Sequence, residues 1–252
     1  WNRHRGGSPA GDRDTRRRDS EPRAAGCAQP PRPSRPARLG LAVTEKRILE
    51  RAIRAAASKE DDWVWVEGPR AVETAARLGV LSHCVLTKDA SPPPACGRIP
   101  AVRWIGKGRG PFLAGTPQGV GGLAPRPRTP PADEFYSART YLLLDGLQIP
   151  GNVGALARAC AAFGVERLVA TAGTADPFGP GSVRGSAGYV FAQPVSFASH
   201  EPREAILARL AQRRIPLLVA QARGGKWPPP VHEPASGWAL LLGTETRGPQ
   251  QI

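Results

Sequence analysis

The sequence has no methionine, only four cysteines and few aromatic residues. The cysteines form no CxxC pair and have no histidines at metal-ligand spacing, which argues against a structural zinc site and favours reduced thiols. No stretch reaches the roughly 18 consecutive apolar residues that a membrane-spanning helix needs. We therefore expect a cytoplasmic protein with no metal site and no membrane partner.

The ends of the sequence differ from its middle. The chain begins with Trp1 and stops at Ile252, shortly after a glycine-containing turn, so we expect a C-terminally truncated fragment of a longer protein. Residues 1–43 are rich in arginine, proline, glycine and serine and contain too few apolar residues to offset the entropy of ordering. They are predicted to form a disordered Arg/Pro-rich tail.

The charge balance is strongly basic. The formal net charge is +14 and the isoelectric point is about 10.9. Such a surplus is typical of proteins that meet polyanions, RNA among them.

The pattern of apolar residues predicts two folded units. Residues 44–124 alternate short apolar strands with amphipathic helices and indicate a small α/β domain. Residues 125–138 are proline-rich at their start and are predicted to form a semi-rigid linker. In residues 139–252, uniformly apolar strands alternate with helices, which predicts a parallel sheet covered by helices on both faces.

The segment from Tyr141 to Gly164 is the centre of the second unit. It reads as a buried strand that ends at Asp145, a turn, and an Ala-rich helix with Asn152 as its N-cap and Gly164 just past its end. Arg158 is the one charged residue in this helix, whose apolar composition predicts burial all round. Arg158 then either extends to an edge of the helix or pairs with a structural carboxylate, or it faces an anion at the mouth of a site.

Three glycine-containing loops follow predicted strands, at residues 145–152, 220–225 and 243–248. Ligands of open parallel sheets bind beyond the carboxyl ends of the strands. A site built from these three loops is predicted, provided that their strands are neighbours.

Two motifs in this order resemble the SpoU/TrmH family of RNA ribose 2′-O-methyltransferases, in the SPOUT superfamily. The first is D-G-L-Q-I-P-G-N-V-G-A-L-A-R, and the second is L-G-T-E-T-R-G. The sequence departs from the family pattern at Ile149, where an Asp is usual, and at Thr246, where a Gly is usual. The motifs match at Asp145, Pro150, Asn152, Gly154, Ala155, Arg158, Leu242, Gly243, Glu245 and Gly248.

The resemblance implies an α/β-knot catalytic domain preceded by a ribosomal-protein-like RNA-binding domain. The third family motif would lie beyond Ile252, so the knotted domain is expected to be incomplete. The implied reaction moves a methyl group from S-adenosylmethionine to a ribose 2′-hydroxyl, and the small domain favours 23S-type ribosomal RNA. A transfer-RNA enzyme of the same family and a non-catalytic RNA-binding relative remain the alternatives; a dehydrogenase is disfavoured because no GxGxxG follows the central strand. A homodimer is expected for the full-length protein.

The resemblance also assigns roles to residues. Arg158 is implied as the central catalytic residue; because an arginine side chain is a poor base, clamping an RNA phosphate or stabilising the developing alkoxide suits it better. Asn152 would orient Arg158 or the ribose, besides capping the helix, and Glu245 would pair with Arg158 or hold RNA. The implied cofactor-binding residues are Ala220, Gln221, Ala222, Leu242, Gly243, Thr244 and Gly248. Arg184 and Ser186 lie in a basic loop and are predicted to contact RNA phosphate, with a solvated surface as the alternative.

Overall fold

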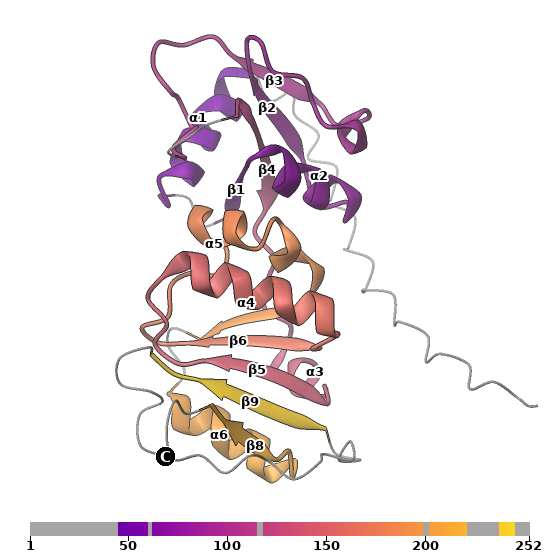
Figure 1. Ribbon diagram of the computed structural model, residues 1–252, viewed down its shortest axis with the longest axis vertical. Coiled ribbons are helices and arrows are strands. Elements are labelled where there is room, and N and C mark those ends of the chain that lie inside the picture. Colours follow the sequence, from indigo (N-terminus) through magenta and orange to yellow (C-terminus); the bar gives the residue numbers. More distant parts are fainter. Residues whose placement is uncertain (1–44, 60–61, 115–117, 199–201, 221–236, 245–252) are drawn as a thin grey trace, which may run out of the picture.

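The computed structural model of the protein describes residues 45–59, 62–114, 118–198, 202–220 and 237–244. These residues form two sheets, one above the other along the long axis of the molecule (Figure 1). Within the described ranges, no helix combines the length and apolar character needed to cross a bilayer. The predicted tail, residues 1–43, lies outside the described part.

The small domain is a four-stranded mixed sheet in the order β1-β4-β2-β3. Strand β4 is antiparallel to both β1 and β2, whereas β2 and β3 are parallel. Trp65, buried in β1, packs edge-on against Phe112 in the core between the sheet and α1. The elements are α1 (Glu45–Ala56), β1 (Trp63–Glu67), α2 (Pro69–Arg77), β2 (His83–Thr87), η1 (Pro94–Cys96), β3 (Ala101–Trp104) and β4 (Val120–Pro125).

The segment predicted as a linker is only partly a spacer. Its second half forms the short helix α3 (Ala132–Phe135), and Phe135, Tyr136 and Ala138 are buried in the core of the second domain. Phe135 and Tyr136 each contact the ring of Tyr141 in the central strand. The prediction of a linker over all of residues 125–138 was therefore too long, because it weighed the prolines and overlooked the two aromatic side chains after them.

The second domain has five parallel strands in the order β7-β6-β5-β9-β8. This confirms the predicted parallel α/β class. The strand predicted from Tyr141 to Leu144 is the middle one. The elements are β5 (Thr140–Leu144), α4 (Pro150–Phe163), β6 (Arg167–Thr171), α5 (Pro180–Gly185), η2 (Tyr189–Ala192), β7 (Val195–Ala198), α6 (Arg203–Gln212), β8 (Leu217–Val219) and β9 (Trp238–Leu242).

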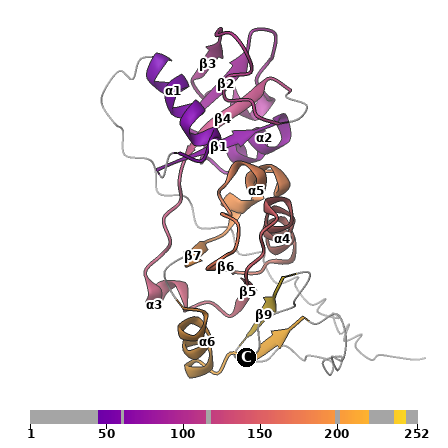
Figure 2. The same ribbon diagram turned by 90° about the vertical axis from the view of Figure 1, so that its left-hand side faces the viewer.

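Both faces of this sheet are covered, as alternation along the strands requires. Leu142 and Leu144 of β5 point into a core shared with α4, and Tyr141 and Leu143 point into a second core shared with α6. Figure 2 shows α4 on one side of the strands and α3 and α6 on the other. A strand buried on both sides explains the uninterrupted apolar run that marked it in the sequence.

Candidate active site at the carboxyl edge of the parallel sheet

The strands that carry the three predicted loops are neighbours. Strand β9 lies between β5 and β8 and is parallel to both, so the loops after these strands leave the same edge of the sheet. The amide of Asp145 donates to the carbonyl of Leu242 over 2.8 Å, and the amide of Ala220 donates to the carbonyl of Leu241 over 3.0 Å. The strand order reverses between β5 and β9, which is where open α/β sheets bind their ligands.

The first loop approaches the third closely. Gly146 has φ +72°, a left-handed conformation that favours glycine, and a Cβ built on it would lie 3.3 Å from Cγ2 of Thr244. Of the predicted cofactor residues, Ala220, Leu242, Gly243 and Thr244 lie at or just beyond the ends of β8 and β9. Gln221, Ala222, Glu245 and Gly248 lie outside the described residues, so their predicted roles stay predictions.

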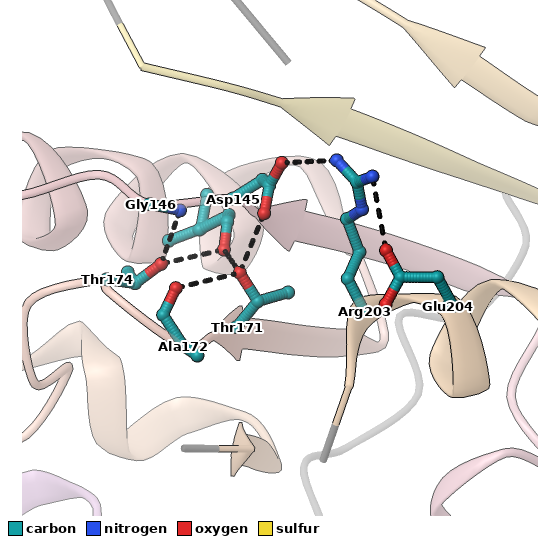
Figure 3. A network of polar contacts seen from close by, with 8 residues as sticks. Asp145, Gly146, Thr171, Ala172, Thr174, Arg203 and Glu204 are labelled. Carbon is teal, nitrogen blue, oxygen red and sulfur yellow. Dashed lines mark hydrogen bonds and ion pairs between the residues drawn. The ribbon is translucent and has the colours of Figure 1, made fainter. Parts of the chain in front are cut away.

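A largely buried ion pair lies at this edge, between Asp145 and Arg203 (Figure 3). The Arg203 Nη1 lies 3.1 Å from the Asp145 Oδ2, and the two side chains are 13% and 11% exposed. The other oxygen of Asp145 accepts a hydrogen bond of 2.9 Å from the hydroxyl of Thr171 at the end of β6. Arg203 also reaches the exposed carboxylate of Glu204, at 3.3 Å. Asp145 thus joins the ends of β5 and β6 to the start of α6.

Two threonines complete the network around the end of β5. The hydroxyl of Thr174 donates to the carbonyl of Leu144 over 2.8 Å and accepts from the amide of Gly146 over 3.0 Å. The hydroxyl of Thr171, which is 2.9 Å from Asp145, also lies 3.2 Å from the carbonyl of Leu144 and can share its proton between the two acceptors. Figure 3 shows these groups gathered around Asp145. Backbone groups that leave a strand at a sheet edge need partners when they are buried. The threonines supply these partners and fix the path of the loop that enters α4.

Sequence reasoning missed Arg203. It lies 58 residues from Asp145 and opens α6, one of the helices predicted to alternate with the strands of the second unit. One signal was available: an arginine in the first turn of a helix meets the positive end of the helix dipole, which is unfavourable unless an anion compensates for it. Asp145 is that anion.

Helix α4 differs from its prediction in two respects. It begins at Pro150, with Ile149 as the cap and no side-chain cap bond, so Asn152 lies in the first turn and is not the N-cap. Proline is well suited to the first helical position because its missing N–H has no helical partner there. The helix does end at Phe163 as predicted, with Gly164 in the left-handed conformation at φ +69°.

The prediction that α4 is buried all round was wrong. Its buried residues are Val153, Gly154, Ala157 and Cys160, and the opposite face is exposed. Arg158 lies on the exposed face, and no hydrogen bond or ion pair joins it to any other residue that the structure describes. Of the two readings of Arg158, pairing with a structural carboxylate is therefore not supported. The exposed face consists of Gly151, Ala155, Arg158, Ala162 and Phe163.

The two predicted RNA contacts fare differently. Ser186 is fully buried; its hydroxyl donates to the carbonyl of Val183 over 2.9 Å and accepts from the amide of Val190 over 3.3 Å. The prediction that Ser186 contacts RNA was wrong, because its hydroxyl is buried and both donates and accepts a hydrogen bond within the fold. Arg184, on α5, is half exposed and lies 3.9 Å from the carboxylate of Glu67 in the small domain. Its role in RNA binding stays a prediction.

Comparison with known proteins supports the resemblance. The model of the SpoU rRNA Methylase family matches residues 139–252. Residues 139–252 belong to this family. The match covers β5 and all the elements that follow it, including both sequence motifs.

Two curated relatives carry specific activities. A 65-residue segment, 26% of this chain, is 38% identical to the Bacillus subtilis 23S rRNA (guanosine-2′-O)-methyltransferase RlmP, of which it covers 26%. A 133-residue segment, 52% of this chain, is 29% identical to the Streptomyces azureus 23S rRNA (adenosine-2′-O)-methyltransferase, of which it covers 48%. The matched segments thus span between a quarter and a half of these relatives' lengths.

The fold is also that of a solved SpoU methyltransferase. The structure of AviRb from Streptomyces viridochromogenes, in complex with the cofactor AdoMet, superposes with a TM-score of 0.59. The superposition covers 79% of this chain and 81% of AviRb at 22% identity. Its coverage extends beyond the 114 residues of the family match, so both domains share in the likeness.

Proposed function

We propose that this chain carries the methyl-transfer domain of an S-adenosylmethionine-dependent RNA ribose 2′-O-methyltransferase. The observation that carries the proposal is that the loops after β5, β9 and β8 leave the same edge of the sheet, in the domain that matches the family. In this domain Arg158 is exposed and has no partner among the described residues. Arg203, by contrast, is held by carboxylates of the chain itself.

The described part of the edge fits the methyl donor. Gly146 places the backbone of the first loop close to Thr244, with no side chain of its own between them. Gly243, next to Thr244, also has no side chain that would fill this space. When bound, S-adenosylmethionine supplies an electrophilic methyl group on a sulfonium. The chain's own task is to hold the donor and the ribose in line and to stabilise the charge that develops on the 2′-oxygen.

Arg158 suits a contact with RNA better than a contact with the donor. It lies eight residues after Pro150, which places its Cα about 12 Å along the helix from the carboxyl edge. A guanidinium there presents a fork of donors to a phosphate that flanks the target ribose. Asn152, in the first turn of α4, lies nearer the edge and is assigned to the ribose or to the orientation of Arg158.

For the substrate, we propose ribosomal RNA of the large subunit over transfer RNA. Both relatives described above carry 23S rRNA names, and the small domain adds a second unit beside the family-matched one. A homodimer of the full-length protein and a cytoplasmic location stay proposals from the family resemblance and from cysteine usage. The net charge of +14 supports a polyanionic substrate in either case.

The test is transfer of a tritiated methyl group from S-adenosylmethionine to purified ribosomal and transfer RNA. We expect label in ribosomal RNA, released as 2′-O-methylnucleoside after enzymatic digestion. Label in a base, or none in any RNA while the donor binds, would contradict the proposed reaction. Label in transfer RNA alone would replace the substrate and keep the chemistry.

A further inference from the structure

The small domain rests on the parallel-sheet domain through a closely fitted contact. Helix α5 and η2 lie between α4 and the small domain in both views (Figures 1 and 2). Gly188, at φ +84°, approaches α2 so closely that a Cβ built on it would lie 2.7 Å from the carbonyl oxygen of Ala71. Val72 of α2 and Val183 and Val190 of the second domain belong to one continuous buried cluster.

An arginine at the start of the linker reaches across this contact. Arg126 directly follows β4, and its two terminal nitrogens lie 2.9 and 2.7 Å from the two carboxylate oxygens of Asp176, in the loop before α5. The same guanidinium lies 5.2 Å from the ring centre of Phe178, whose amide donates to Asp176 over 2.9 Å. A two-pronged pair of this kind fixes orientation as well as distance.

A second charge lies in the same contact. Glu67, at the end of β1, is 2% exposed and accepts hydrogen bonds from the amides of Leu113 and Ala114, over 3.3 and 3.0 Å. Arg184 of α5 approaches this carboxylate from the other domain, at 3.9 Å. The linker is held further along as well, because the hydroxyl of Thr129 donates to the carbonyl of Val195 in β7 over 3.2 Å.

We infer that the Arg126–Asp176 pair fixes the orientation of the small domain on the parallel-sheet domain, so that RNA held by the small domain meets the carboxyl edge at a set distance. Arg126 is then a positioning residue for methyl transfer. The fixed orientation of the two domains is inferred from the contacts alone. The role of Arg126 in positioning RNA rests on the proposed function. A proline-rich linker by itself would leave the spacing variable.

The test compares four variants of the chain by small-angle X-ray scattering and by steady-state kinetics. Arg126→Asp and Asp176→Arg each place like charges in contact, and the double variant restores an opposite pair. Arg128→Asp is the matched control: it makes the same charge change two residues later, at an exposed position with no ion pair among the described residues. Circular dichroism shows whether each variant keeps its secondary structure.

We expect each single reversal to increase the radius of gyration, and the double variant and Arg128→Asp to match the wild type. The kcat for RNA should fall by about 10- to 100-fold in the single reversals, with an unchanged Kd for S-adenosylmethionine. Scattering curves for the single reversals that equal the Arg128→Asp curve, or a double variant that stays expanded, would overturn the inference. A wild type that transfers no methyl group would instead count against the proposed function, since the scattering result does not depend on it.

Discussion

The two sides of α4 have similar composition and opposite environments. The side with Gly154, Ala157 and Cys160 is packed against the sheet and α5, whereas the side with Ala155 and Arg158 is open. On the packed side every contact is made within the chain, and small residues are there because the neighbouring backbone is close. On the open side the one charged group has no partner among the described residues. The packed side of α4 therefore stabilises the fold, whereas Arg158 on the open side is available to a ligand.

The largest effect on stability is expected at Asp145, in the loop that leads into α4. Asp145→Asn removes the less exposed of the two carboxylates that face Arg203; breaking a fully buried pair costs about 3–5 kcal/mol, which is the upper limit for this largely buried one. Urea unfolding followed by circular dichroism measures the loss. The matched control is Glu204→Gln, which removes the other carboxylate near Arg203; at 74% exposure it should cost less than about 1 kcal/mol. Equal losses of unfolding free energy in the two variants would contradict the view that Asp145, and not Glu204, is the stabilising partner of Arg203.

A smaller effect is expected from filling the packed side of the helix. A Cβ at Gly154 would fall on the carbonyl oxygen of Ser182 in α5 and 2.7 Å from the amide of Ser186. Gly154→Ala should therefore destabilise the fold by about 1–3 kcal/mol, because backbone on both sides must move. Thermal unfolding measures the change.

Gly151 offers the control on the open side. A Cβ there would meet nothing within 4 Å, so Gly151→Ala should leave the fold unchanged or stabilise it by up to about 1 kcal/mol. Two alanine substitutions three residues apart on one helix are thus expected to have opposite signs. Equal melting temperatures for the two variants would remove the contrast between the sides.

Thiol chemistry gives a third contrast. Burial raises the pKa of the Cys160 thiol to about 12, despite an opposing hydrogen bond with Gln193. At pH 8 iodoacetamide should leave Cys160 unmodified in the folded protein and label Ala162→Cys, two residues later on the open side, as peptide mass mapping would show. The unfolded thiol loses its proton near pH 9, before the folded one, so the free energy of unfolding should fall as pH rises above 9. Rapid native labelling of Cys160 would contradict its burial.

Much of the fold was predictable because its signals are local. The uninterrupted run Tyr141–Leu144 marks a strand with two covered faces, and Gly164 marks the end of α4. The position of the candidate site rests on a topology rule that needs only the strand order. The pairing of Asp145 with Arg203 did not follow, because no sequence pattern connects residues 58 positions apart. The exposed face of α4 was missed for a related reason: alanine and glycine occur equally well against a sheet and in solvent.

The most direct test of the account is methyl transfer by Arg158→Ala, measured beside its unfolding curve. We expect an unfolding midpoint equal to that of the wild type, an unchanged affinity for S-adenosylmethionine, and loss of label from ribosomal RNA. Arg158→Lys, which keeps the charge and loses the fork of donors, should recover only part of the activity. Wild-type labelling by Arg158→Ala would show that the open side of α4 takes no part in the reaction.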